Sequence, residues 1–188
     1  MSPQKIPAIL LVDEHLVVGE VQTRGQRLLE VLNDHLTDWL HVYDVHLARR
    51  EAKTSSVEAL NEVAIRKSEL KLALLGGGKH ESPEKRRFSF VDKRLHFAVA
   101  LVGGYEVRGR LHLKGSSDVD RVLVEMSNFV PLTEATVAHA GMAGEKLDAS
   151  VVLINKAAIS MFHVGDSLPL APAAEPSAGP ELAENLSR

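Results

Sequence analysis

The sequence predicts an all-β protein in which one small unit of strands, with a short inserted helix, occurs twice. Three observations predict it: runs in which apolar and polar residues alternate, a glycine pair suited to a tight turn, and a match of the chain to itself at an offset of 90 residues. The chain of 188 residues is 45% hydrophobic, which is enough for one ordinary domain or two small ones.

The internal match joins residues 8–48 to residues 98–138 without a gap. The residues identical at this offset are Ala8, Leu11, Val12, Val17, Gly19, Gly25 and Ala48, and Gly19 and Gly25 meet Gly109 and Gly115. Trp39 meets another aromatic residue, Phe129, and after a loop one residue shorter Lys67 meets Lys156. Two β-rich segments could also look alike because alternation is common, but the shared glycines, aromatic residue and apolar rhythm favour a duplicated unit.

Each copy is predicted to begin with a hairpin, in which residues 105–113 alternate as a half-buried strand should. Gly103 and Gly104 precede this strand and allow the positive φ angles of a tight turn, whereas Asp13 and Glu14 take their place in the first copy. The apolar period then becomes helical over residues 26–36 and 117–126. Strand patterns return at 38–48 and 128–138, where Pro131 predicts an edge or a bulge. Each copy closes with a β-rich segment that is bent at a pair of polar residues, Arg66-Lys67 in the first copy and Asn155-Lys156 in the second.

Composition divides the chain into four parts. The first unit is predicted to span residues 5–75 and the second residues 95–165. Residues 76–94 contain three consecutive glycines, a proline and a basic cluster, which is typical of a flexible linker running into the second unit. Residues 166–188 are rich in proline and alanine and are predicted to be a disordered tail.

The totals exclude several classes of protein. The formal net charge is −3 and neither half is strongly basic, so no basic nucleic-acid-binding tail is present. The absence of cysteine excludes disulfides, thiolate catalysis and zinc sites that use cysteine. The apolar run near the N-terminus is broken by Asp13, Glu14 and His15, which predicts a soluble, cytoplasmic protein without a membrane partner.

The hairpin of the second unit resembles the first motif of the Sm and Sm-like family. Its spacing is reproduced by Leu101, Gly103, Gly104, Val107, Gly109 and Leu111, and partly by Leu11, Asp13, Val17, Gly19 and Val21. The closing segments 65–70 and 154–159 resemble the second Sm motif, although Arg66-Lys67 and Asn155-Lys156 stand where the family has Arg-Gly. Arg27-Leu28 with Leu32-Asn33 also resembles a bacterial family of small β-domains, a likeness that implies no function.

The Sm resemblance implies two tandem small β-barrels related by internal duplication, each of five bent antiparallel strands with glycine where a strand bends sharply. It also implies assembly through paired edge strands, and RNA binding. The structural positions are Gly19, Gly25, Gly103, Gly104, Gly109 and Gly115, with Trp39 and Phe129 as core anchors rather than a binding platform. Candidate nucleic-acid residues are Arg66, Lys67, Lys85, Arg86, Arg87 and Lys156. The family's loop Asp and Asn are absent here, which weakens the RNA expectation.

The basic cluster of the linker has two interpretations. Lys85, Arg86 and Arg87 stand beside Phe88 and Phe90, so basic side chains could neutralise phosphates while a ring stacks on a base. The alternative, which the composition favours, is a solvated linker whose aromatic residues begin the first strand of the second unit.

The chain contains no convincing catalytic, metal or cofactor site. His41, Asp44 and His46 suggest metal ligands, but on a strand only Asp44 and His46 share a face, so a polar strand face is favoured. Gly76-Gly77-Gly78-Lys79 lacks the first glycine and the hydroxyl of a phosphate loop. We therefore expect no enzymatic activity, no cofactor and no metal.

Two functions remain in competition. The first is a non-enzymatic assembly or interaction protein, a homo-oligomer or a binder of a protein partner, because small barrels expose edge strands that need partners. The second is an RNA-binding Sm-like protein that uses the basic residues above. A ligand-responsive regulatory domain with the linker as hinge is a third reading without residue-level support.

Overall fold

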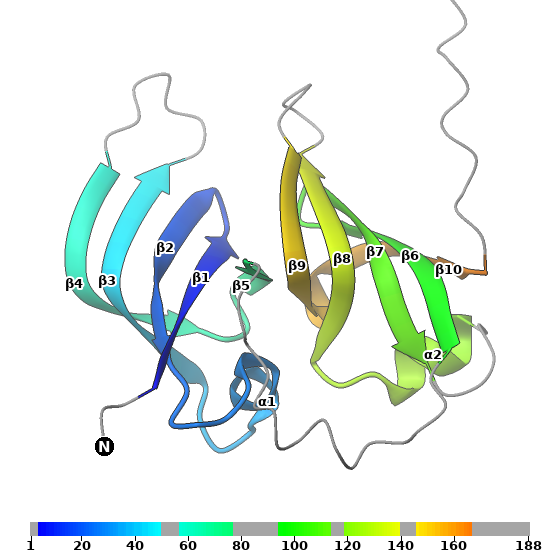
Figure 1. Cartoon of the computed structure of the whole chain (residues 1–188), viewed down its shortest axis with the longest axis horizontal. Coiled ribbons are helices and arrows are strands. Elements are labelled where there is room, and N and C mark those ends of the chain that lie inside the picture. The colour runs from blue at the N-terminus through cyan, green and yellow to red at the C-terminus, as the bar shows by residue number, and fades with distance from the viewer. Residues whose placement is uncertain (1–3, 50–56, 77–93, 114–118, 140–145, 167–188) are drawn as a thin grey trace, which may run out of the picture.

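The computed structural model describes residues 4–49, 57–76, 94–113, 119–139 and 146–166. Within them the protein is all-β with two short α-helices, as predicted (Figure 1). Most of the predicted linker, the tail beyond Asp166, Gly115 and the basic cluster at Lys85, Arg86 and Arg87 lie outside the described residues.

Residues before and after the linker form two halves with the same order of elements. The first half consists of β1 (Lys5–Val12), β2 (His15–Gln22), α1 (Leu28–Asn33), β3 (Trp39–Arg49), β4 (Val57–Arg66) and β5 (Leu70–Leu75). The second half consists of β6 (Arg94–Val102), β7 (Tyr105–Leu113), α2 (Val119–Glu125), β8 (Phe129–His139), β9 (Lys146–Asn155), the 3-10 turn η2 (Lys156–Ala158) and β10 (Ile159–Gly165). The predicted helices are therefore present. α1 is shorter than its periodic pattern at both ends, and α2 ends one residue before its pattern does.

The ten strands of the described residues belong to one open sheet, in the order β10-β6-β7-β8-β9-β5-β1-β2-β3-β4. In each half four strands form a meander, and the fifth returns to pair with the first. The expected pair of closed barrels is not what the hydrogen bonding forms. Because β9 pairs with β5, the two halves share one sheet, and β4 and β10 are its edges.

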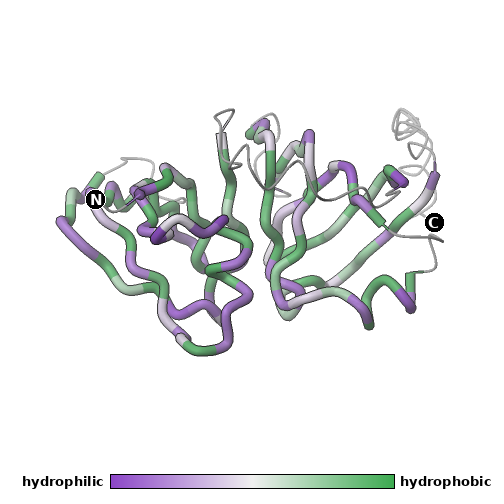
Figure 2. The backbone as a smooth tube through the Cα atoms, turned by 60° about the horizontal axis from the view of Figure 1, so that its bottom comes forward, coloured by the Kyte–Doolittle hydropathy of each residue, from purple (hydrophilic) through white to green (hydrophobic). Residues whose placement is uncertain are grey.

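The two cores lie on opposite faces of this sheet. Leu10 packs in the cluster of the first half while the next residue, Leu11, packs in the cluster of the second half. Because successive side chains of a strand point to opposite faces, neighbouring residues serve different cores. Figure 1 shows the two curved halves, and Figure 2 shows hydrophobic and hydrophilic residues alternating along many of their strands.

Gly19 and Gly109 have the same role in the two halves. A Cβ on Gly19 would lie 2.8 Å from the carbonyl oxygen of Tyr43, and one on Gly109 would lie 3.1 Å from that of Thr133. Each glycine therefore lets the third strand of its half cross close to the second. The sequence prediction that these two positions are equivalent agrees with this geometry.

A β-bulge stands opposite each of these glycines. The ladder of β2 and β3 shifts register between Val18 and Glu20, and that of β7 and β8 shifts between Arg108 and Arg110. The extra residues are Asp44 and Glu134, with φ of 52° and 49°. A bulge bends its strand and increases the twist, so the curvature of both halves begins at matching points.

Both predicted hairpin turns, Gly25 and Pro131 have the backbone features that their residue types allow. Asp13 has a φ of 48°, and Gly103 and Gly104 have 55° and 85°, so both hairpin turns are present. Gly25 has a φ of 82°. Pro131 lies in β8 beyond the last residue that pairs with β7, where its missing N–H removes no bond from that ladder.

Replacing Gly19 with alanine is expected to reduce the free energy of unfolding by about 1–3 kcal/mol, because the added methyl overlaps backbone and side-chain atoms of β3. Gly109→Ala should cost less, since its nearest neighbours lie at 3.0–3.1 Å. Urea unfolding measures both, with Gly76→Ala as the control because nothing lies within 4 Å of its Cβ position. Equal midpoints for the Gly19 and Gly76 variants would contradict the assigned role.

Candidate interaction surface

The place where the two halves meet is the best-defined contact surface in the described residues. β5 and β9 run antiparallel, with Leu72 opposite Ile154 and Leu74 opposite Val152. Leu72 and Leu74 are at most 3% exposed and belong to the core of the second half. In return, Leu153 belongs to the core of the first half. Each half thus completes the other by exchanging apolar side chains.

Polar contacts fix the register of this junction. The Asn33 side chain of α1 donates a hydrogen bond to the carbonyl oxygen of Phe129 at 3.0 Å and accepts one from its backbone N–H at 2.8 Å. The amide nitrogen of Asn155 donates to the carbonyl oxygens of Ser68 and Leu70, at 3.2 and 2.9 Å. Neither asparagine was singled out from the sequence as a contact residue. The sequence marks Asn155 only as the polar residue that ends an apolar run, in the pair Asn155-Lys156.

Lys67, one of the candidate nucleic-acid residues, is a buried structural residue rather than a surface cation. Its side chain is 7% exposed, and its ammonium donates to the carbonyl oxygens of Val31 and Asp34 at 2.7 and 2.9 Å. A third bond reaches the hydroxyl of Thr37 at 3.2 Å. Burial lowers the pKa of Lys67, against the opposing pull of Asp34 and Asp38. The ammonium therefore caps the end of α1.

Lys156 occupies the matching place in the second half. Its ammonium donates to the carbonyl oxygen of Met126, just after α2, at 3.3 Å. Its backbone N–H donates to the carbonyl oxygen of Asn128 at 2.8 Å, as that of Lys67 does to Asp38. In both halves the lysine ammonium thus donates to a carbonyl oxygen at the C-terminal end of the helix. Sequence spacing identified them as equivalent but not as helix caps.

Trp39 is not a core anchor, which corrects the sequence expectation, whereas Phe129 is one. Phe129 is 3% exposed and packs in the core of the first half. Trp39 is 47% exposed, and the guanidinium of Arg66 lies 5.1 Å from the centre of its ring. The difference follows from position, because β8 and β9 meet the other half while β3 and β4 end at the free edge.

The other free edge, β10, shows the same contrast with its counterpart β5. Met161 is 45% exposed, although the equivalent Leu72 is fully buried. His163 is exposed where Leu74 is 3% exposed. The positions that complete a core at the internal junction are therefore open to solvent at both edges of the sheet.

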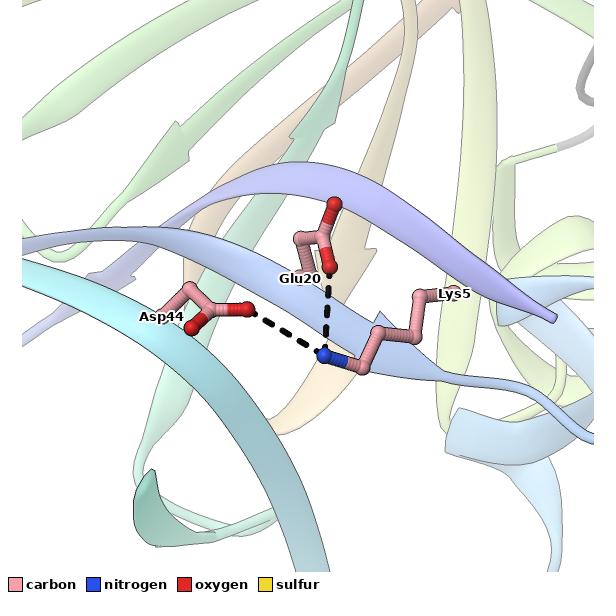
Figure 3. A network of polar contacts seen from close by, with 3 residues as sticks. All are labelled: Lys5, Glu20 and Asp44. Atoms are coloured by element: carbon pink, nitrogen blue, oxygen red, sulfur yellow. Dashed lines mark hydrogen bonds and ion pairs between the residues drawn. The ribbon is translucent and has the colours of Figure 1, made fainter. Parts of the chain in front are cut away.

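Two of the three residues that suggested a metal site, His41 and Asp44, have other partners. His41 lies 2.9 Å from a carboxylate oxygen of Glu62. The Asp44 carboxylate accepts a hydrogen bond from Lys5 at 3.2 Å, and Lys5 also pairs with Glu20 at 3.3 Å (Figure 3). These carboxylates, Asp44 first, raise the pKa of Lys5. Among the described residues no three groups of metal-ligating type converge.

A cleft of about 610 Å³ lies over β6, β7 and β8 on the second half. Its basic side chains include Arg108 and Arg110, which pair with Glu106 and Glu134. The cleft therefore presents balanced charges rather than a focused positive site for an anion.

Comparison with family models, curated proteins and solved structures gives no match. Neither helix in the described part of the chain is long and apolar enough to cross a membrane.

Replacing Lys67 with methionine is expected to lower the free energy of unfolding by about 2–4 kcal/mol, because it leaves buried carbonyl oxygens without a donor. Lys156→Met is the matched control and should cost less, since its ammonium makes one longer bond. Chemical denaturation of both variants measures the difference. If the two variants lost equal stability, the capping role assigned to Lys67 would not hold.

Proposed function

We propose that this chain is a non-enzymatic assembly protein built from two Sm-like modules, whose copies join head to tail by pairing β10 of one copy with β4 of the next. The observation that carries the proposal is the internal junction, in which β5 of one half pairs with β9 of the other. β10 is the counterpart of β5, and β4 is the counterpart of β9. The free edges are therefore the two sides of a contact that the chain already makes once.

The internal register specifies the proposed contact residue by residue. In the closing strands of the two halves, equivalent residues are 89 positions apart, as Lys67 and Lys156 are. Replacing each residue of the β5–β9 pairing by its equivalent places Met161 opposite Ile65, His163 opposite Val63, and Val164 opposite Glu62. An exposed strand edge presents unpaired N–H and C=O groups that a further strand can satisfy. Main-chain hydrogen bonds between β10 and β4 thus supply the affinity between copies, and the facing side chains determine which strand is selected as the partner.

Side chains of the first half near the β4 edge are less completely buried than the equivalent side chains of the second half near β9. Leu47, Leu60 and Val63 are only partly buried. Their counterparts Val137, Ala149 and Val152 are 2%, 8% and 0% exposed, because strands of the first half cover that flank. A neighbouring β10 would cover the corresponding flank of the first half. Burial of apolar side chains at about 25 cal/mol per Å² would favour this association.

The contact joins two different surfaces, so it is heterologous. A heterologous contact closes into a ring when its rotation divides a full turn, and otherwise propagates as a filament. Because every copy brings two halves, a closed ring contains an even number of them. RNA binding, the alternative, has less support, since Lys67 is buried and the ammonium of Lys156 is hydrogen-bonded.

Assembly is expected to change the fluorescence of Trp39, the single tryptophan of the chain. Its ring is 47% exposed in one copy, and its counterpart at the internal junction is 3% exposed. Emission should therefore shift to shorter wavelength as the protein concentration rises, in step with the mass measured by light scattering. A monomer at all concentrations, with constant emission, would contradict the proposal.

Met161→Asp is expected to weaken association by at least tenfold, because it would place a charge where the internal junction buries a leucine. Val18→Asp is the matched control, since Val18 is similarly exposed at 39% but lies on β2, away from both edges. Sedimentation velocity measures the mass, and circular dichroism checks that both variants fold. Equal effects of the two substitutions would show that assembly does not use β10.

A further inference from the structure

The strand that the proposed contact buries differs from its internal counterpart at one titratable position. β5 carries Leu74, which is 3% exposed and packs in the core of the second half. β10 carries His163 at the equivalent place, and its side chain is exposed in a single copy. Histidine is the side chain whose charge ordinarily changes between pH 5 and 8.

The surroundings of His163 in the proposed contact are apolar. Within its own chain His163 lies opposite Val99 of β6. By the internal register it would lie opposite Val63 of the neighbouring β4, with Met161 against Ile65. The residues directly opposite the imidazole, Val99 and Val63, are therefore apolar, and its same-face neighbours along β10 are Met161 and Gly165.

The titratable and charged groups of the elements that pack near β10 are paired or lie on other positions. Asp166, which directly follows β10, lies 2.7 Å from Nδ1 of His96 on β6. On the same sheet face Arg108 of β7 follows Val99 and is paired with Glu106. On the neighbouring β4, Glu62 and Arg66 alternate with Val63 and Ile65, so they point to the opposite face. On α2, which packs against β10, the charged residues are Asp120, Arg121 and Glu125, and Arg121 pairs with Glu125 at 2.8 Å.

We propose that protonation of His163 opens the contact between copies, while the internal junction of each copy stays closed. This inference rests on the proposed assembly. An imidazolium buried among apolar side chains loses its hydration without gaining an acceptor, which opposes the charged form. The assembled state therefore holds His163 neutral, whereas the free edge can bind a proton. The internal junction has leucine at this position and does not respond to the proton.

The sign and size of the effect follow from proton linkage. Forming one contact releases the proton of a protonated His163. The association constant should therefore fall as the pH falls through the range in which histidine ordinarily gains its charge, by up to about tenfold for each pH unit. Toward pH 8 this group should have little effect on the association constant. Assembly is thus expected at pH 8 and dissociation into folded single copies at pH 5.5.

The test follows the mass of the full chain by sedimentation velocity at pH 8, 7, 6 and 5.5. His163→Leu introduces the residue that the internal junction carries. This variant should stay assembled at all four pH values, and at low pH it should associate more tightly than the unchanged chain does. His163→Gln removes the titration but keeps a polar side chain, so it should give weaker, pH-independent assembly. His112→Leu is the control, because His112 lies on β7, away from both edges, and this variant should behave like the unchanged chain.

Circular dichroism at each pH confirms that the single copies remain folded. Assembly that is equally strong at pH 8 and 5.5, or a His163→Leu variant with the pH dependence of the unchanged chain, would overturn the role of His163 and leave the proposed assembly standing. A monomer at every pH would overturn the assembly itself and this inference with it.

Discussion

The pairing of β5 with β9 is the contact on which the rest of the structure depends. It joins ten strands into one sheet and brings leucines of the first half into the core of the second. Strands at such a position need apolar residues on both faces, and β5 has them in Leu72 and Leu74 on one face and Ala73 and Leu75 on the other. Burial on both faces is what distinguishes a central strand from an edge.

The same requirement explains why the edges differ from the centre. On β4 the face opposite Val63 and Ile65 carries Glu62, Ala64 and Arg66, and all three are exposed. Charged residues on an edge strand weaken unselective pairing with other chains. Beside this edge strand, Trp39 at the start of β3 is nevertheless half-exposed. This combination suits a contact that is selective and reversible, in contrast to the permanent junction inside the chain.

Much of the fold could be predicted from the sequence, because its signals are local. Gly19 and Gly109, the turn at Gly103, and the change from a period of two to a helical period each reflect a nearby backbone constraint. The bulges at Asp44 and Glu134 were not predicted, since neither residue type favours positive φ as glycine does. The single open sheet was also missed. Its cause is a pairing between strands on the two sides of the linker, and alternation along one strand does not identify its neighbour.

The candidate site was predictable only in part, for a related reason. The equivalence of Lys67 and Lys156 is visible in the spacing, but their capping role depends on carbonyl oxygens more than twenty residues away in the chain. Trp39 and Phe129 are equivalent in sequence and opposite in exposure, because only one of them has the other half beside it. Surroundings of this kind are set by the tertiary structure and leave no mark on the residues themselves.

The exchange of leucines also bears on how the chain folds during its synthesis. β5 is complete at Leu75, but its partner β9 begins only at Lys146. At the usual rate of translation the ribosome needs about 4–14 s to make the intervening residues. Throughout that interval Leu72 and Leu74 have no core to enter, so the nascent first half presents a bare apolar strand to the chaperones and neighbouring chains around it.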